Sequence, residues 1–223
     1  MDDDVRSLLD AADHVLIAFD GPLCSFADPS TARATAERLR ILLGPDLPRK
    51  LASTDDPFEV LRYAQTCGEH TAHVVERQLY RFEAQAAMTA GPAEGALEAV
   101  RTLYATGHTV TVVGNQSTEA VHTFVVMHEL HHEARRISAR SGARTRLLPD
   151  PFLLTEVVEA LGTTPQRCLF IGWSAQDAEA GQAAGIPVLG CGRAPRRRGT
   201  AATVGSMAEL ARPVDLSGWP TRR

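Results

Sequence analysis

The sequence contains a single lysine, Lys50, and arginine supplies all of its other basic residues. Its 23 basic residues are outnumbered by 27 acidic ones, which gives a formal net charge of −4. Nucleic acids and anionic membrane surfaces attract proteins with an excess of basic residues, and this acidic charge balance shows no such excess. We therefore expect neither nucleic acid nor a membrane among the partners of the chain.

Long apolar runs and closely paired cysteines are also missing. No stretch approaches the roughly 18 apolar residues of a membrane-spanning helix. The acidic start, Met1-Asp2-Asp3-Asp4, is unlike a signal peptide. None of the four cysteines has CxxC spacing, so we expect them to be reduced and structural, and the protein to be cytoplasmic. With 223 residues, 44% of them hydrophobic, the chain suits one folded domain with a sizeable insertion.

A short apolar run near the start predicts a buried strand. Val15 to Ala18 is apolar, and Asp20-Gly21-Pro22, a strong turn signal, follows it. The turn places a carboxylate at the carboxyl end of the strand, which is the edge where open α/β sheets bind ligands. We therefore expect Asp20 to lie at that edge.

The segment 24–90 shows helical periodicity and no strand. Apolar residues recur at helical spacing in 31–43, from residue 57 onward and in 71–88. Gly44-Pro45 ends the first of these helices, and Pro57 suits the first turn of the second. Three consecutive helices directly after the first strand predict an inserted helical cap over the strand ends.

From residue 91 onward, helices alternate with short buried strands. Expected helices cover 93–106, 117–138, 151–161, 175–184 and 206–210, and expected strands cover 110–113, 168–171, 187–189 and a short stretch at Val204. This alternation predicts an α/β fold with a doubly wound parallel sheet covered on both faces. We expect a sheet domain of 1–23 and 91–212, a cap of 24–90 and a tail of 213–223, with 193–198 as a solvated basic loop.

Several short phrases follow one another in an informative order. After the opening strand come Gly91-Pro92-Ala93-Glu94-Gly95, then Leu148-Pro149-Asp150-Pro151, and then 171–188, which reads IGWSAQDAEAGQAAGIPV. Their order and spacing resemble the haloacid dehalogenase-like (HAD) hydrolase superfamily, in particular phosphoglycolate-phosphatase-like members with a helical cap. The resemblance covers about residues 5–211 and implies a Rossmann-like core.

The resemblance also implies a chemistry. In the family, one carboxylate attacks phosphorus and a second serves as general acid and base. A Ser or Thr hydroxyl and a lysine hold the transferred phosphoryl group, and acidic residues fix Mg²⁺ beside it. A full set of these groups would make the chain a phosphoric monoester hydrolase.

Most of the corresponding positions are changed in this chain. The nucleophile position is Ala18, the acid/base position is Asp20 and the hydroxyl position is Gly114. The lysine position is Leu148. Of the two acidic positions that would bind the metal, one is Trp173, and Asp177 alone keeps its carboxylate. Losing a nucleophile alone can remove about 10⁶-fold in rate, and losing one electrostatic stabiliser about 10²–10³-fold. The pattern therefore predicts a catalytically inactive pseudo-phosphatase that binds an unidentified small molecule or protein.

A second interpretation is a HAD-family hydrolase with displaced catalytic residues that uses Asp20. Arg146, two residues from Leu148, could then supply a cation to the site. We expect no cofactor, and Mg²⁺ only if such residual hydrolysis exists, with Asp20 and Asp177 as weak candidates for a metal site. The sequence leaves homo-oligomer formation open.

Each candidate for facing a ligand also has a structural interpretation. Asp20 can instead cap the turn after its strand, and Asp177 can cap its helix, which is the interpretation we favour. Trp173 either fills the vacated metal pocket, which we also favour, or offers a stacking surface to a ligand. Asn115, next to the hydroxyl position, is the fourth candidate.

A different chemistry is suggested by His128-Glu129-Leu130-His131-His132, which satisfies the HExxH signature of zinc peptidases. On the expected helix 117–138, His128 and His132 would share one face, with Glu129 as the base and Glu156 as a distant third ligand. A zinc peptidase is the remote alternative, because we expect this helix to lie on the solvent-covered side, away from the strand ends.

Overall fold

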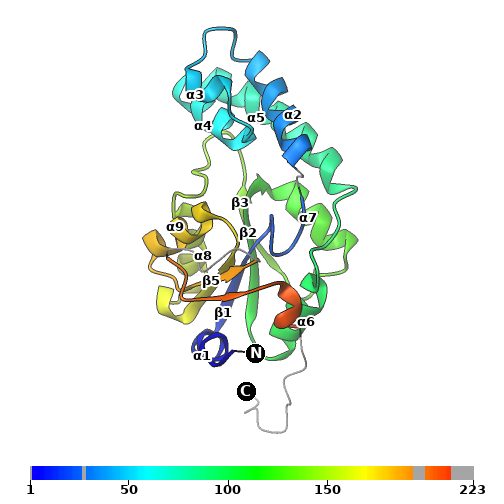
Figure 1. The fold of residues 1–223 in the computed structure, drawn as a ribbon, viewed down its shortest axis with the longest axis vertical. Coiled ribbons are helices and arrows are strands. Elements are labelled where there is room, and N and C mark those ends of the chain that lie inside the picture. The colour runs from blue at the N-terminus through cyan, green and yellow to red at the C-terminus, as the bar shows by residue number, and fades with distance from the viewer. Residues whose placement is uncertain (1, 27–28, 193–198, 212–223) are drawn as a thin grey trace.

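Six parallel strands form one sheet in the part of the chain that the structure, a computed structural model, describes: residues 2–26, 29–192 and 199–211. The strands are β1 (His14–Ala18), β2 (Thr109–Ser117), β3 (Arg136–Arg140), β4 (Cys168–Gly172), β5 (Val188–Cys191) and β6 (Ala202–Val204). Their spatial order is β3-β2-β1-β4-β5-β6 (Figure 1). The predicted doubly wound α/β fold is confirmed. The expected basic loop 193–198 and the tail 213–223 lie outside the described residues.

Alternate residues of β1 pack against helices on opposite faces of the sheet. Val15 and Ile17 belong to the apolar cluster that includes α1 (Asp3–Ala11), α6 (Ala96–Ala105) and α7 (Thr118–Met127). Leu16 and Ala18 belong to the cluster that includes α8 (Phe152–Leu161) and α9 (Ala175–Ala184). Since side chains alternate along a strand, a fully apolar β1 is what a sheet covered on both faces requires.

The remaining helices gather beyond the carboxyl ends of the strands, at one end of the molecule (Figure 1). They are α2 (Pro29–Ile41), α3 (Arg49–Ala52), α4 (Pro57–Thr66) and α5 (Glu69–Ala87), called the cap helices below. Their own apolar cluster is built around buried residues such as Leu39, Leu61 and Leu79. Leu147, from the loop that follows β3, also belongs to that cluster. The sheet domain therefore extends one side chain into the packing of the cap.

Arg140, at the carboxyl end of β3, joins the sheet to α5. Its fully buried guanidinium pairs with Glu76, at 2.5 Å from Nη1 to Oε1, and with Glu83. Its Nε donates to the carbonyl oxygen of Asn115 at 3.1 Å. The N–H of Ser117 donates to Glu83 Oε2 at 3.0 Å. Two carboxylates of one cap helix thus share a single guanidinium of the sheet domain.

Further hydrogen bonds hold the loop after β3 against α4. Arg62 Nη1 donates to the carbonyl oxygen of Leu148 at 3.1 Å. Gln65 Nε2 donates to the carbonyl oxygen of Ala143 at 2.9 Å. These contacts, together with the Arg140 pairs, fix the cap helices over the strand ends.

Two of the expected helices differ from the structure. The expected helix 117–138 is wrong, because α7 ends at Met127 and the same stretch contains β3. His128 caps the helix, and Glu129 has a φ of 56°, which turns the chain out of the right-handed helical region. The strand was hidden by its composition, since Arg136 and Arg140 flank a short apolar core in an edge strand. The last expected helix, 206–210, is a 3₁₀ turn over Met207–Glu209.

Two smaller observations complete the fold. In the described ranges, no helix is both long enough and apolar enough to cross a bilayer. All four cysteines are free. Burial, with a smaller contribution from Asp20, raises the pKa of the Cys24 thiol to about 12, so this cysteine is not a thiolate near neutral pH.

We predict that Arg140→Ala strongly destabilises the protein. The substitution leaves the carboxylates of Glu76 and Glu83 without their shared cation, and breaking a buried pair in this way costs about 3–5 kcal/mol. Urea unfolding followed by circular dichroism measures the loss. Arg144→Ala is the control, because Arg144 pairs with Glu69 at the surface, where both side chains are mostly exposed. That pair is worth about 0–1 kcal/mol. Equal losses in the two variants would contradict the role of Arg140.

Candidate functional site

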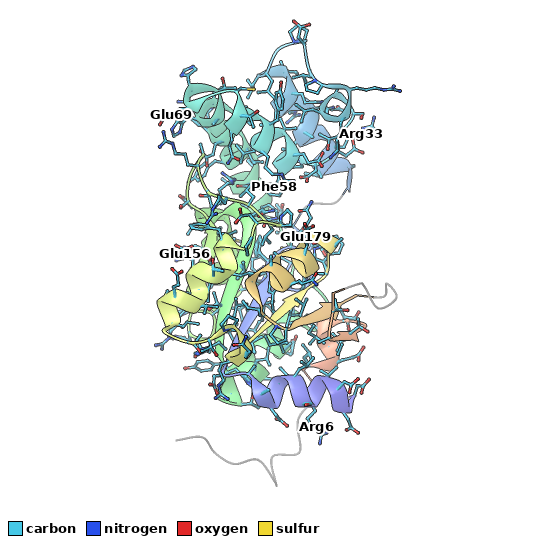
Figure 2. The ribbon with its side chains drawn as sticks, turned by 90° about the vertical axis from the view of Figure 1, so that its left-hand side faces the viewer. Arg6, Arg33, Phe58, Glu69, Glu156 and Glu179 are labelled. Carbon is cyan, nitrogen blue, oxygen red and sulfur yellow. The ribbon has the colours of Figure 1, made fainter. Side chains whose placement is uncertain are left out.

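A cavity of about 740 Å³ lies between the carboxyl ends of β1, β2 and β4 and the cap helices α2, α4 and α5. This is the edge where open α/β sheets hold ligands. From the cap, Phe58 of α4 lines the cavity and lies on the side of the cap that faces the sheet domain (Figure 2). The positions singled out in the sequence therefore share one space, and each can be compared with its expected role.

The nucleophile position is an apolar part of the cavity floor. Ala18 is 3% exposed and packs in the cluster that contains Val113 and Leu148. Leu148, at the lysine position, is 4% exposed. Both residues line the cavity, and their side chains contain carbon as the only heavy atom. Neither can attack phosphorus or neutralise a phosphate.

The hydroxyl position is filled by a neighbour. A Cβ atom added at Gly114 would come within 2.7 Å of Gln116 Oε1 and 3.1 Å of Phe19 Cβ. Gln116 is 3% exposed and lines the cavity. Its amide oxygen therefore occupies the space that a Ser or Thr side chain would need. This contact could not be predicted from the sequence, because Gln116 has no counterpart among the family phrases.

Asn115 is used for structure. Its Oδ1 accepts a hydrogen bond from the N–H of Leu148 at 2.8 Å, and its Nδ2 donates to the carbonyl oxygen of Leu148 at 3.4 Å. Asn115 is 8% exposed and still contributes to the cavity lining. Its amide holds the loop after β3 against the end of β2.

Asp20 combines its two expected roles. Its Oδ1 accepts a hydrogen bond from the N–H of Phe26 at 3.2 Å, so the carboxylate caps the turn after β1. The residue is half-buried and lines the cavity. Asp20 is therefore a turn cap that also faces the cavity.

Asp177 belongs to a capping box at the start of α9. Its Oδ2 accepts hydrogen bonds from the N–H groups of Trp173 (3.0 Å) and Ser174 (2.9 Å), and Ser174 Oγ accepts from the Asp177 N–H at 3.0 Å. Asp177 is 5% exposed. This geometry agrees with the structural interpretation of Asp177, because the carboxylate already serves the helix terminus.

Trp173 lies across the turn after β1 and is not buried as we favoured. Its ring covers Gly21, where an added Cβ would come within 2.2 Å of the indole, and Gly21 has a φ of 93°. The residue is nevertheless 44% exposed and lines the cavity. Packing against Gly21 holds one side of the indole and leaves surface that a ligand can contact.

The residues present do not fit Mg²⁺. The ion prefers oxygen ligands in near-octahedral geometry, and the family position for one such ligand is the indole of Trp173. Asp177 is committed to two backbone N–H groups. Among the described residues, no three His, Cys, Asp or Glu side chains are grouped so as to hold a metal ion. No catalytic step through a metal follows from this site.

The zinc-peptidase interpretation is contradicted by the local backbone. His128 lies at the C-cap of α7 and Glu129 beyond it, so the five residues do not form one helical face. His128 Nε2 lies 3.2 Å from the carbonyl oxygen of Ala90, and the rings of His131 and His132 contact each other at 4.2 Å. His128 and His132 therefore do not lie one turn apart on a helix, as the HExxH motif needs.

Arg38 of α2 is the cation that the sequence analysis missed. It lines the cavity, with Cζ 5.4 Å from the centroid of the Phe82 ring. Arg146 does not line the cavity and lies 4.7 Å from the ring centroid of Phe152 at the surface. Lys50 is 88% exposed beside Glu59. Arg38 was hidden because its position depends on how the cap helices pack over the sheet.

We predict that Gly114→Ser destabilises the protein through Gln116. The new side chain must displace the Gln116 amide and press on Phe19, and such overpacking costs about 1–3 kcal/mol. In the double variant with Gln116→Ala, part of this cost disappears, with a coupling of at least about 0.5 kcal/mol in a double-mutant cycle by urea unfolding. Gly142→Ser is the control, because a Cβ there meets nothing within 4 Å. Strictly additive losses at 114 and 116 would contradict the proposed overlap.

Comparisons with known proteins were made at the level of sequence and of structure. A family model described as haloacid dehalogenase-like hydrolase matches residues 47–191, a stretch that begins after Ala18 and Asp20. No curated protein matches the chain. Similar solved structures include a protein described as a predicted phosphoglycolate phosphatase from Haemophilus somnus, with 16% identity, a TM-score of 0.66 and coverage of 90% of this chain and 96% of that one.

Two further solved structures were determined with phosphate. CbbY from Rhodobacter sphaeroides, in complex with phosphate, has 18% identity and a TM-score of 0.65, with coverage of 89% of this chain and 96% of that one. A HAD family hydrolase from Deinococcus radiodurans, with bound phosphate and sodium, has 25% identity and a TM-score of 0.59, with coverage of 90% and 93%. The likeness extends over both the sheet domain and the cap helices.

Proposed function

The chain belongs to the haloacid dehalogenase-like hydrolases, and we propose that it is a non-catalytic member that binds a ligand in the cavity between the sheet and the cap helices. The observation that carries the proposal is the chemistry of the cavity floor. Ala18, Leu148 and the Gly114–Gln116 pair stand where the family places a nucleophile, a cation and a hydroxyl. Each replacement removes a group that catalysis would need.

The replacements also support one another physically. The methyl group of Ala18 packs in an apolar cluster with Leu148, and the amide of Gln116 fills the space beside Gly114. A Cβ added at Gly172 would come within 2.6 Å of Asp177 Cβ, so the turn after β4 is equally closed. This packing of the floor supports a loss of the catalytic groups over their displacement.

Phosphate would be poorly held by such a floor. A phosphate dianion needs cations or several aimed N–H donors to offset its desolvation. Among the described residues that line the cavity, Arg38 is the one positively charged side chain, and it stands on the cap. The phosphate in the two solved structures therefore does not lead us to expect phosphate as the ligand of this chain.

The cavity itself has been kept. Its volume of about 740 Å³ falls within the range of roughly 300–1,000 Å³ typical of small-molecule sites. Aromatic rings from both layers face it, with Phe58 and Phe82 on the cap and Trp173 on the sheet side. A space of this size and lining supports a small molecule as the ligand, and a protein partner is the second candidate.

We predict no phosphatase activity above background. The purified chain is assayed with p-nitrophenyl phosphate and with a panel of sugar phosphates in the presence of Mg²⁺, beside an active phosphatase as positive control. Asp20→Asn is expected to give the same background rate as the unaltered chain. Ala18→Asp alone is also expected to stay inactive, because each of the other missing stabilisers costs about 10²–10³-fold.

One outcome would overturn this proposal. Turnover well above background that is lost in Asp20→Asn would show that the carboxylate at the end of β1 catalyses hydrolysis. The chain would then be a hydrolase with displaced machinery, the interpretation favoured by the position of Asp20 in the cavity wall.

A further inference from the structure

The charges around the cavity are unevenly distributed. Of the described side chains that line it, five are carboxylates and one is a guanidinium, that of Arg38. Some of the carboxylates have partners outside the cavity, as Asp56 has in Arg62 at 3.2 Å. The wall is still far from the positive surface that a phosphate-binding pocket presents. An acidic wall alone does not define a ligand, so a more specific feature is needed.

That feature is the carboxyl group of Glu83. The residue is 3% exposed and lies in the cavity wall. Its Oε2 receives both of its hydrogen bonds, from Arg140 and from the N–H of Ser117. Its Oε1 is buried and has no hydrogen-bond partner. A buried carboxylate oxygen without a hydrogen-bond donor lowers the stability of the fold, and a donor supplied by a ligand would remove this cost.

The charge balance around Glu83 points to a cationic donor. Glu76 and Glu83 share Arg140, so this buried triad carries one negative charge more than it has positive charges. Burial raises the pKa of Glu83, although Arg140 and Ser117 act in the opposite direction. A second positive group near Oε1 would neutralise the triad and satisfy the oxygen together.

Gln116 provides a second polar group at the same corner. It immediately precedes Ser117, whose N–H is bound by Glu83. The residue is 3% exposed and lines the cavity, and its side-chain amide has no hydrogen bond to any of the described residues. The Gln116 amide oxygen and the Glu83 carboxylate belong to residues that line the same cavity, and both are acceptors for N–H groups on a ligand.

We propose that the cavity binds a small organic cation, an ammonium or guanidinium group on an apolar body. The cationic head lies at the corner formed by Glu83 and Gln116, and the body lies against the aromatic lining, which includes Phe58, Phe82 and Trp173. The aromatic faces favour a cation as well as an apolar body. This inference rests on the proposed function, because it names the class of ligand for the same cavity.

The test uses three probes that differ in charge on a similar apolar body. Phenethylamine carries an ammonium group, 2-phenylethanol is its neutral analogue, and phenyl phosphate is an anion. Binding to the full chain is measured by isothermal titration calorimetry and by thermal unfolding. We expect saturable binding of phenethylamine, at least about tenfold tighter than that of 2-phenylethanol because the contact is charge-assisted. Phenyl phosphate is expected not to saturate.

Three variants locate the cationic head. Glu83→Gln removes the charge in the cavity wall and is expected to weaken phenethylamine binding at least about tenfold. Glu76→Gln removes an equal charge from the same triad but leaves the Glu83 carboxylate in place, and Glu76 does not line the cavity, so it should weaken binding less than Glu83→Gln does. If Glu83→Gln fails to fold, Gln116→Leu tests the placement of the cationic head instead, because this substitution leaves the Arg140 pairs intact. It should weaken binding about threefold or more.

The outcomes separate this inference from the proposed function. Phenyl phosphate that binds better than phenethylamine without being hydrolysed would overturn the cation and leave a non-catalytic ligand-binding protein. Phenyl phosphate that is hydrolysed in an Asp20-dependent way would overturn the proposed function itself. Equal phenethylamine affinity in the unaltered chain, Glu83→Gln and Gln116→Leu would overturn the placement at this corner, and no saturation by phenethylamine would overturn the inference as a whole.

Discussion

The buried guanidinium of Arg140 is the interaction on which the site depends. It stands at the carboxyl end of an edge strand, yet both of its acidic partners belong to α5 of the cap. Because two buried carboxylates are unfavourable without it, the position of α5 over the strand ends follows from this one side chain. The same contact brings Glu83 into the cavity wall and binds it to the backbone of Ser117. The Arg140–Glu83 contact therefore both links the cap to the sheet and places a carboxylate in the cavity wall.

The floor of the cavity is packed from residues that replace the groups of a phosphate site in the proposed function. Ala18 and Leu148 are buried in a shared apolar cluster, so a charged residue at either position would now be placed among carbon atoms. Gln116 occupies the space beside Gly114. The Asp177 carboxylate, which stands at a metal-binding position of the family, accepts hydrogen bonds in the capping box with Ser174. A catalytic side chain restored at one of these positions would therefore contact the residues that now pack there.

The alternation of apolar runs and helices was enough to predict the sheet domain, the cap and the position of Asp20 at the strand end. It was not enough for β3, because Arg136 and Arg140 break the apolar run, and an edge strand needs burial on fewer sides. The HExxH pattern misled for a local reason, since Glu129 adopts a positive φ that spacing alone does not reveal. Glu83 and Arg38 carry no local signal at all, as their place in the cavity depends on how α5 and α2 pack over the sheet.

The proposed loss of catalysis and the proposed class of ligand have the same physical basis. A phosphatase floor must be positive enough to hold a phosphate and its transition state, and that field would pair with any acidic side chain in the wall. With Leu148 and Trp173 at the lysine and metal positions, Arg38 is the one cation among the described residues that line the cavity, against five carboxylates. Glu83 has its partner outside the cavity, on β3, and one of its oxygens remains without a donor. The apolar floor and the buried Glu83 oxygen without a donor thus point to a ligand of the opposite charge to phosphate.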